Sequence, residues 1–257
     1  MEDVLTEPPP QSRFFPEDLD NFATPSPPIP STFLSIYPDA NPDTFPPSLL
    51  VIAISAPSTF LIGQISNKTP IGTLIIPEAT GVGTSVEPIV RNKSCNIYAV
   101  DRLPAPAILV AFPFTIPAER SGEVAKVLLG EINAENVLIL DGIQSVNYRS
   151  RLSSDEAVAF KLETQEQRRG GDPLVRRLEY LPSGSVIGGL GAALLGESQM
   201  RKKRATLCVT WPENGQLSVV PLLKPLLNDL GLDVAGFENW KNETIRVSSR
   251  SYPDLYA

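Results

Sequence analysis

An unbroken apolar run near residue 50 constrains the fold more than any other stretch of the sequence. Ser48–Ser55 reads Ser-Leu-Leu-Val-Ile-Ala-Ile-Ser, which has the length of one β-strand and no alternating polar positions. A continuous run of this kind is typical of a strand that is buried on both faces, as in a parallel or mixed sheet with helices on each side. The run therefore predicts an α/β fold.

A second stretch predicts how strands and helices alternate. Ala107–Phe112 and Asn136–Leu140 read as buried strands, and Pro117–Ile132 between them reads as a helix. Pro117 suits the first turn of this helix, because its missing N–H would have no partner there. Apolar residues recur along the helix at spacings of three and four. Strand, helix and strand at this spacing predict one βαβ unit.

Four further segments have the composition and length of strands: Phe60–Ile65, Thr73–Ile76, Asn96–Val100 and Ala205–Thr210. We expect the first two to form a hairpin. A helix is predicted at Ile187–Gly196, where small residues favour close packing, and another at Val219–Leu230, which begins near Pro221 and is capped by Gly231. The charged segment Leu152–Leu178 predicts a solvated, partly helical connection. Together these elements predict a single three-layer domain with a mixed, largely parallel central sheet.

The two ends of the chain differ from this domain. Residues 1–47 hold 12 of the 26 prolines, which predicts a mostly disordered arm whose later part lies along the domain surface. The α/β domain is predicted to span residues 48–247. Residues 248–257 are predicted to form a flexible tail, because Pro253 blocks both a helix and a strand there.

The amino-acid composition excludes or disfavours several classes of function. The chain has no histidine, which excludes Ser-His-Asp and Cys-His hydrolase arrangements and most zinc sites. Cys95 and Cys208 lie far apart in the sequence and predict free thiols in a reducing compartment. The net charge of −7 argues against non-specific binding to nucleic acid. No apolar run of about 18 residues is present that would span a membrane. We expect no metal and no cofactor.

Asp141 is the best candidate for a catalytic residue. It follows a predicted buried strand, and open α/β sheets bind ligands at the carboxyl ends of their strands. The alternative is that Asp141 and Gly142 only make the turn that ends the strand. The loop Thr80–Ser85 lacks the Gly-Lys-Ser/Thr ending of a phosphate-binding loop, so a surface turn is the simpler interpretation.

Two other motifs have a structural and a functional interpretation. The stretch from Gly189 to Leu194 lacks the third glycine of a dinucleotide-binding motif, and no acidic residue marks a ribose site. Arg201–Arg204 is a compact basic cluster. It fits cations at the end of a helix, where they complement the negative pole of the helix dipole. The functional interpretation is that the cluster forms a nuclear localisation signal or a patch that binds an acidic partner.

The tail offers a candidate site of another kind, because it ends in Leu255, Tyr256 and Ala257. Leu255 can fill an apolar pocket, and Tyr256 combines a ring with a hydroxyl that needs a partner when it is buried. The Ala257 carboxylate can pair with a cation or with backbone N–H groups. These three residues are predicted to bind a partner, with a frayed terminus as the alternative.

Four of these segments resemble the proteasome assembly chaperone 1 family in its plant form: the strand Leu49–Ser55, the strand and turn Asn136–Tyr148, the small-residue helix Ile187–Gly196 and the ending Leu255-Tyr256-Ala257. The ending is the most specific of these similarities, because members of this family end in a hydrophobic residue, a tyrosine and then any residue. The small-residue helix is also similar to that of the wider superfamily that includes proteasome assembly chaperone 2.

The resemblance implies an α/β fold similar in layout to the nucleoside phosphorylases but without catalytic equipment. It implies a heterodimer with a chaperone 2 subunit that caps the α-ring of the 20S proteasome during assembly and blocks premature dimerisation of rings. Leu255 and Tyr256 would enter a pocket between α-subunits, with the Ala257 carboxylate facing a pocket lysine. The expected location is the cytoplasm, together with the nucleus if Arg201–Arg204 acts as a localisation signal.

Two other functions stay open at this point. One is an enzyme of the nucleoside-phosphorylase or hydrolase type that uses Asp141 and the Thr80–Ser85 loop. The other is an interaction scaffold that works through the proline-rich arm.

Overall fold

The structure is a computed structural model of the whole chain, and it describes residues 30–37, 47–80, 89–101, 106–149, 156–213 and 216–234. The chain divides into two compact units. One consists of residues 31–76 and 92–257, and the other of residues 1–30 and 77–91. Of the second unit the structure describes Pro30 and the outer ends of two strands, so the fold reported below is that of the first unit.

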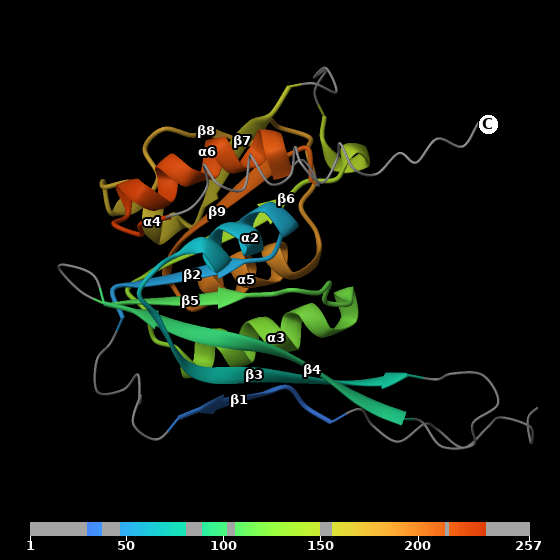
Figure 1. Cartoon of the computed structure of the whole chain (residues 1–257). Helices are drawn as coiled ribbons and strands as arrows, with labels where there is room; N and C mark the ends of the chain where they lie inside the picture. The colour runs from blue at the N-terminus through green and yellow to red at the C-terminus, as the bar shows by residue number, and fades with distance from the viewer. Residues whose placement is uncertain are drawn as a thin grey trace, which may run out of the picture. The chain divides into compact units, whose positions relative to one another are not determined.

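A mixed sheet of nine strands forms the centre of this fold (Figure 1). Its strand order is β1-β3-β4-β5-β2-β6-β9-β7-β8. The strands are β1 (Phe33–Ile36), β2 (Leu49–Ala53), β3 (Lys68–Thr80), β4 (Ile89–Val100), β5 (Ala107–Ala111), β6 (Asn136–Gly142), β7 (Val158–Glu163), β8 (Glu179–Tyr180) and β9 (Arg204–Trp211).

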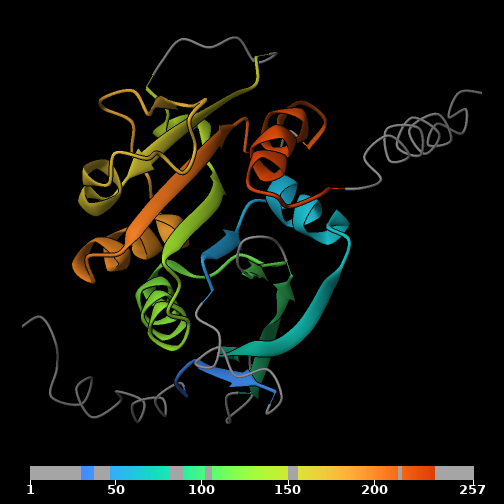
Figure 2. The ribbon, with the colours of Figure 1, turned by 90° about the vertical axis from the view of Figure 1, so that its left-hand side faces the viewer.

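Helices cover both faces of the sheet (Figures 1 and 2). They are α2 (Ala56–Gln64), α3 (Ala118–Glu131), α4 (Gln165–Arg169), α5 (Gly189–Met200), α6 (Gln216–Asp229) and the 3-10 turn η2 (Ser145–Asn147). The helices α3 and α5 pack on one face, and α2 and α6 pack on the other. This arrangement confirms the predicted α/β class and its mixed central sheet. None of the helices described is long and apolar enough to cross a membrane.

The central strand β2 explains the apolar run at its position. It pairs in parallel with β5 on one side and with β6 on the other. Every residue of β2 is buried. Leu50 and Ile52 pack on the face covered by α3 and α5, and the alternate residues pack on the face covered by α2 and α6. Because both faces are covered by helices, neither needs polar residues, and the predicted buried strand is confirmed.

The predicted βαβ unit is present as β5, α3 and β6, with β2 lying between its two parallel strands. Pro117 occupies the N-cap position of α3. The predicted small-residue helix is α5, and the predicted last helix is α6. Pro221 lies inside α6, not at its start. Gly231 adopts a positive φ of 75° just after α6, which is the conformation expected of a glycine cap.

The prediction of a strand at Phe60–Ile65 is wrong, because most of this segment belongs to the helix α2. Ser55 occupies its N-cap position and Pro57 lies in its first turn. Pro57 and Leu61 are both buried, and a spacing of four residues places them on one helical face. The hairpin with Thr73–Ile76 does not form, because these residues belong to β3, which pairs with β1.

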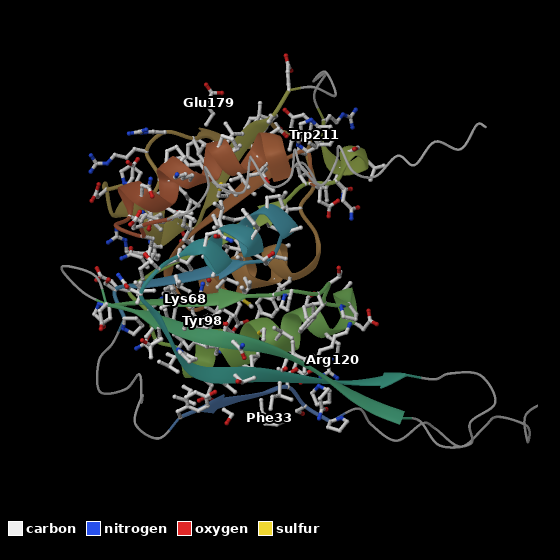
Figure 3. All side chains as sticks on the ribbon, in the orientation of Figure 1. Phe33, Lys68, Tyr98, Arg120, Glu179 and Trp211 are labelled. Carbon is white, nitrogen blue, oxygen red and sulfur yellow. The ribbon has the colours of Figure 1, made fainter. Side chains whose placement is uncertain are left out.

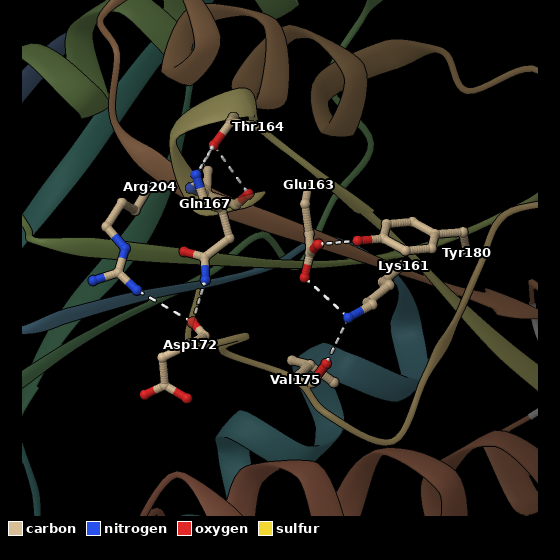
Figure 4. A network of polar contacts seen from close by, with 9 residues as sticks. Lys161, Glu163, Thr164, Gln167, Asp172, Val175, Tyr180 and Arg204 are labelled. Atoms are coloured by element: carbon tan, nitrogen blue, oxygen red, sulfur yellow. Dashed lines mark hydrogen bonds and ion pairs between the residues drawn. The ribbon is translucent and has the colours of Figure 1, made fainter. Parts of the chain in front are cut away.

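The prediction that residues 152–178 are solvated is wrong for β7, which pairs antiparallel with β9. Two charged residues of β7, Lys161 and Glu163, are buried. Lys161 Nζ lies 3.0 Å from Glu163 Oε1 and donates to the Val175 carbonyl at 3.0 Å. The Tyr180 hydroxyl donates to the other oxygen of Glu163, so the ion pair is held on two sides (Figure 4). Within β7, the charges of Lys161 and Glu163 therefore neutralise each other inside the fold.

The edge strand β1 lies within the region predicted as an arm, and the sequence analysis did not predict it. It pairs antiparallel with β3. Thr32, just before β1, is tied to α3, because its N–H donates to Glu123 and Arg120 donates to its hydroxyl at 3.1 Å. Figure 3 shows Phe33 on this strand and Arg120 on the helix. Residues 31–37 are therefore part of the folded unit.

Candidate functional site

A cavity of about 410 Å³ opens where the parallel strands β2, β5 and β6 end. Backbone hydrogen bonds join these strand ends: Phe112 N–H donates to the Ala53 carbonyl, and Ile54 N–H donates to the Leu140 carbonyl, both at 2.9 Å. The apolar wall consists of Ile54, Phe112, Phe114, Ile116, Ile143 and Leu190. The carboxyl end of the strands is where open α/β sheets bind their ligands, so this cavity is the first candidate site.

Asp141 lines this cavity at the end of β6, as its sequence position indicated. It stands on the same side of the strand as Val137 and Ile139, which pack on the face covered by α3 and α5. A Cβ on Gly191, in the first turn of α5, would lie 3.2 Å from Asp141 Cγ and closer still to Oδ2. The absence of a side chain at Gly191 therefore makes room for the carboxylate.

The surroundings of Asp141 disfavour its charged form. Burial raises the pKa of Asp141 to about 6, although the Gly142 N–H that donates to Oδ1 at 2.8 Å acts in the opposite direction. The nearby Glu213 carboxylate raises this pKa further, because two negative charges repel. No described residue donates a hydrogen bond to Oδ2.

Glu213 lines the same cavity, and the sequence analysis did not identify it. A Cβ on Gly142 would lie 2.9 Å from Glu213 Cγ, so Gly142 admits Glu213 as Gly191 admits Asp141. Within the described part of the chain, Glu213 forms no ion pair. The signal that would have found it is its position two residues after the buried strand β9, which is the rule that identified Asp141.

The composition of the cavity weighs against phosphate chemistry. Among the described residues that line it, none is basic. A phosphate group bound near Asp141 and Glu213 would be repelled and would lack the cations that usually hold it. Of the Thr80–Ser85 loop the structure describes only Thr80, the last residue of β3. Among the described residues no group of His, Cys, Asp and Glu could hold a metal ion.

The glycine pair at the start of α5 does not form a dinucleotide cradle. Gly189 has a positive φ of 62°, which allows the chain to turn into the helix. Gly191 faces the Asp141 carboxylate, which would repel a pyrophosphate at this helix N-terminus.

The basic cluster Arg201–Arg204 is engaged within the fold. Arg201 donates to Glu197 at 2.6 Å and to the Leu129 carbonyl at 3.3 Å, which connects the end of α5 to the end of α3. Lys203 donates to the side chain of Asn133 at 3.0 Å. These contacts support the interpretation of the cluster as helix-end cations.

The partner-binding residues predicted from the sequence, Leu255, Tyr256 and Ala257, lie outside the described residues. Their role therefore stays a prediction.

No protein-family model matches the chain, and no curated protein matches it. Solved structures do. PbaB from Pyrococcus furiosus, described as an archaeal proteasome activator, superposes with a TM-score of 0.60 at 15% identity, over 86% of this chain and 98% of PbaB.

PbaA from the same organism, described as an archaeal homolog of proteasome-assembly chaperone, superposes with a TM-score of 0.57 at 16% identity, over 86% of this chain and 91% of PbaA. The chain has the fold of these proteasome-related archaeal proteins. At these identities the similarity concerns the fold. It agrees, at that level, with the family resemblance noted in the sequence.

Proposed function

We propose that this protein is a chaperone of proteasome assembly and that it works by binding, not by catalysis. The observation that supports this most is the superposition along almost the full length of PbaB and PbaA, which are a proteasome activator and a homolog of proteasome-assembly chaperone. The two carboxylates in the cavity have no basic residue beside them among the described lining residues, which a phosphate-using enzyme would need.

The finer form of the proposal follows the family resemblance. The protein pairs with a chaperone 2 subunit, and the heterodimer caps the α-ring of the 20S core while it assembles. Leu255 and Tyr256 enter a pocket between α-subunits, where the Ala257 carboxylate meets a lysine. This work takes place in the cytoplasm, and also in the nucleus if Arg201–Arg204 acts as a localisation signal.

The energies indicate that the tail acts together with a larger surface. Burying Leu255 contributes roughly 1.5–3 kcal/mol, and the ring of Tyr256 contributes a similar amount. A charge-assisted hydrogen bond to the Ala257 carboxylate adds about 1.5–3 kcal/mol. Ordering three backbone residues costs about 1–2 kcal/mol each. The remainder corresponds to roughly millimolar affinity, so stable capping requires the folded unit to bind as well.

The proposal is tested by affinity purification of the tagged full chain, followed by mass spectrometry. We expect α-ring subunits and a second subunit related to this chain to co-elute. Recovery of neither would contradict the assembly role.

The role of the tail is tested with two further variants. Removal of Leu255–Ala257 should reduce the recovery of α-ring subunits while the related second subunit still co-elutes. A variant with a few residues added after Ala257 keeps both side chains and displaces the carboxylate. It should lose part of the α-ring recovery. Unchanged recovery with both variants would exclude docking through the tail.

A second candidate function, a phosphorolytic or hydrolytic enzyme, has one observation in its favour, which is the position of Asp141 in a cavity at the carboxyl ends of the strands. It is tested by thermal unfolding with nucleosides and phosphate. A stabilisation that disappears in Asp141→Ala would favour the enzyme.

A further inference from the structure

The cavity at the carboxyl ends of β2, β5 and β6 holds two carboxylates that no described cation balances. Asp141 Oδ1 accepts one backbone hydrogen bond, from Gly142, and no described residue donates to Oδ2. Glu213 has no ion-pair partner among the described residues. Elsewhere in the described structure the buried carboxylate Glu163 has both Lys161 and Tyr180. Asp141 and Glu213 are half-buried and share one cavity, so a positive charge from outside would find two carboxylates there with no described cation already paired to them.

The backbone is arranged to bring both carboxylates into the cavity. Gly191 leaves the space that Asp141 occupies, and Gly142 leaves the space that Glu213 occupies. An alanine at either position would clash with the carboxylate side chain or its backbone. The first turn of α5 offers Asp141 partial compensation through the helix dipole. Glu213 lies between the end of β9 at Trp211 and the start of α6 at Gln216.

The remaining walls indicate what kind of positive charge fits. Phe112, Phe114 and Ile116 give the cavity apolar sides, and Gln144 and Asn147 give it neutral polar ones. Its volume of about 410 Å³ falls within the range of small-molecule sites. An inorganic cation would leave the apolar walls without contact. An organic amine has an apolar body for these walls and a charged group for the carboxylates.

We propose that this cavity binds a small organic molecule with a protonated amine, whose ammonium group lies between Asp141 and Glu213 and whose apolar body packs against Phe112, Phe114 and Ile116. The site is independent of the proposed role in proteasome assembly, and neither proposal requires the other. A lysine side chain of a partner protein offers the same ammonium group. The apolar walls on several sides of the cavity favour the small molecule, because they contact its apolar body, and the test below uses free amines.

The test is a titration of the full chain with benzylamine and n-butylamine, with benzyl alcohol and n-butanol as neutral counterparts of the same shape. Binding is measured by isothermal titration calorimetry. It is located by NMR through the amide signals of Gly142 and Gly191. We expect the amines to bind roughly 10- to 100-fold more tightly than the alcohols, because a charge-assisted hydrogen bond is worth about that factor. We expect both amide signals to move.

Three variants complete the test. Asp141→Asn and Glu213→Gln keep the shape of each side chain and remove its charge, and each should weaken amine binding roughly 10-fold or more. Glu179→Gln removes an exposed carboxylate on β8 and should leave amine binding unchanged. Amine affinity should also fall as the pH is lowered through about 6, where Asp141 becomes protonated beside Glu213.

Equal binding of amines and alcohols would overturn the proposal, as would the absence of signal changes at Gly142 and Gly191. Loss of binding in Glu179→Gln to the same extent as in Asp141→Asn would also overturn it, because the effect would then be one of net charge. None of these outcomes bears on co-purification with proteasome subunits.

Discussion

At the scale of single residues, the cost of holding Asp141 in its cavity has a pH signature. Its pKa is raised from 3.8 to about 6, so the folded state binds more protons than the unfolded state between these values. The free energy of unfolding therefore falls as the pH rises through this window. Above pH 6 the protein bears the full cost of holding Asp141 in its ionised form inside the cavity. Asp141→Asn should stabilise the protein by about 1–3 kcal/mol near pH 7.5 and by almost nothing near pH 4. Urea unfolding at the two pH values measures this difference. The exposed Glu179→Gln is the control, and an equal gain at both pH values would contradict the assignment.

Two glycines of α5 provide a matched pair at the same scale. A Cβ on Gly191 would meet the Asp141 carboxylate, whereas a Cβ on Gly196 has open space around it. Gly191→Ala should therefore destabilise the protein by about 1–3 kcal/mol through forced displacement of Asp141. Gly196→Ala should stabilise it by up to about 1 kcal/mol, because alanine favours the helix. Chemical denaturation distinguishes the two, and a loss of stability in both variants would show that the helix tolerates no side chain on either face.

At the scale of elements, the end of α5 is connected to the end of α3 through one side chain. Arg201 pairs with Glu197 and donates to the carbonyls of Leu129 and Lys126, which lie in the last turns of α3. Arg201→Ala should cost about 1–3 kcal/mol, because Glu197 loses its partner and these carbonyls lose a donor. The neighbouring Lys202 has a positive φ of 55°, so Lys202→Gly should be neutral or slightly stabilising. Thermal unfolding of both variants checks this. A loss in Lys202→Gly as large as in Arg201→Ala would mean that charge alone matters here.

The elements that the sequence predicts well are those whose pattern does not depend on a distant partner. β2 and the segment Val137–Leu140 of β6 are continuously apolar, and such runs are typical of buried strands. The strand β7 was missed because Lys161 and Glu163 read as surface residues, and only the fold brings them together with Tyr180.

The sequence favours a strand over the second half of α2, because Phe60, Leu61 and Ile62 follow one another there. Its start signals were present, with Ser55 at the N-cap and Pro57 in the first turn. In the cavity, strand order makes Asp141 predictable. The same rule selects Glu213, two residues after β9, but only the parallel pairing of β9 with β6 brings the two carboxylates to one edge, and that pairing is not visible in the local sequence.

At the scale of the whole molecule, two deletions from the N-terminus test which part of the predicted arm the folded unit needs. Because β1 pairs with β3 and Thr32 contacts Glu123 and Arg120, a deletion that stops before residue 31 preserves these contacts and a longer one removes them. We expect deletion of residues 1–30 to change the free energy of unfolding by less than about 0.5 kcal/mol. Deletion of residues 1–46 should cost about 2 kcal/mol or more, through the lost strand hydrogen bonds and the exposure of Leu34.

The pair of deletions also bears on function. The longer one leaves the edge of β3 without its neighbour, and an open strand edge promotes association between chains. Loss of partner binding in that variant alone would therefore report on folding, not on the arm.

The shorter deletion isolates the proline-rich segment. If it retains co-purification with proteasome subunits, the arm is not the interaction scaffold and binding resides in the folded unit and the tail. Loss of co-purification with unchanged stability would move the binding function to residues 1–30. Urea unfolding and affinity purification of the same two variants distinguish these outcomes.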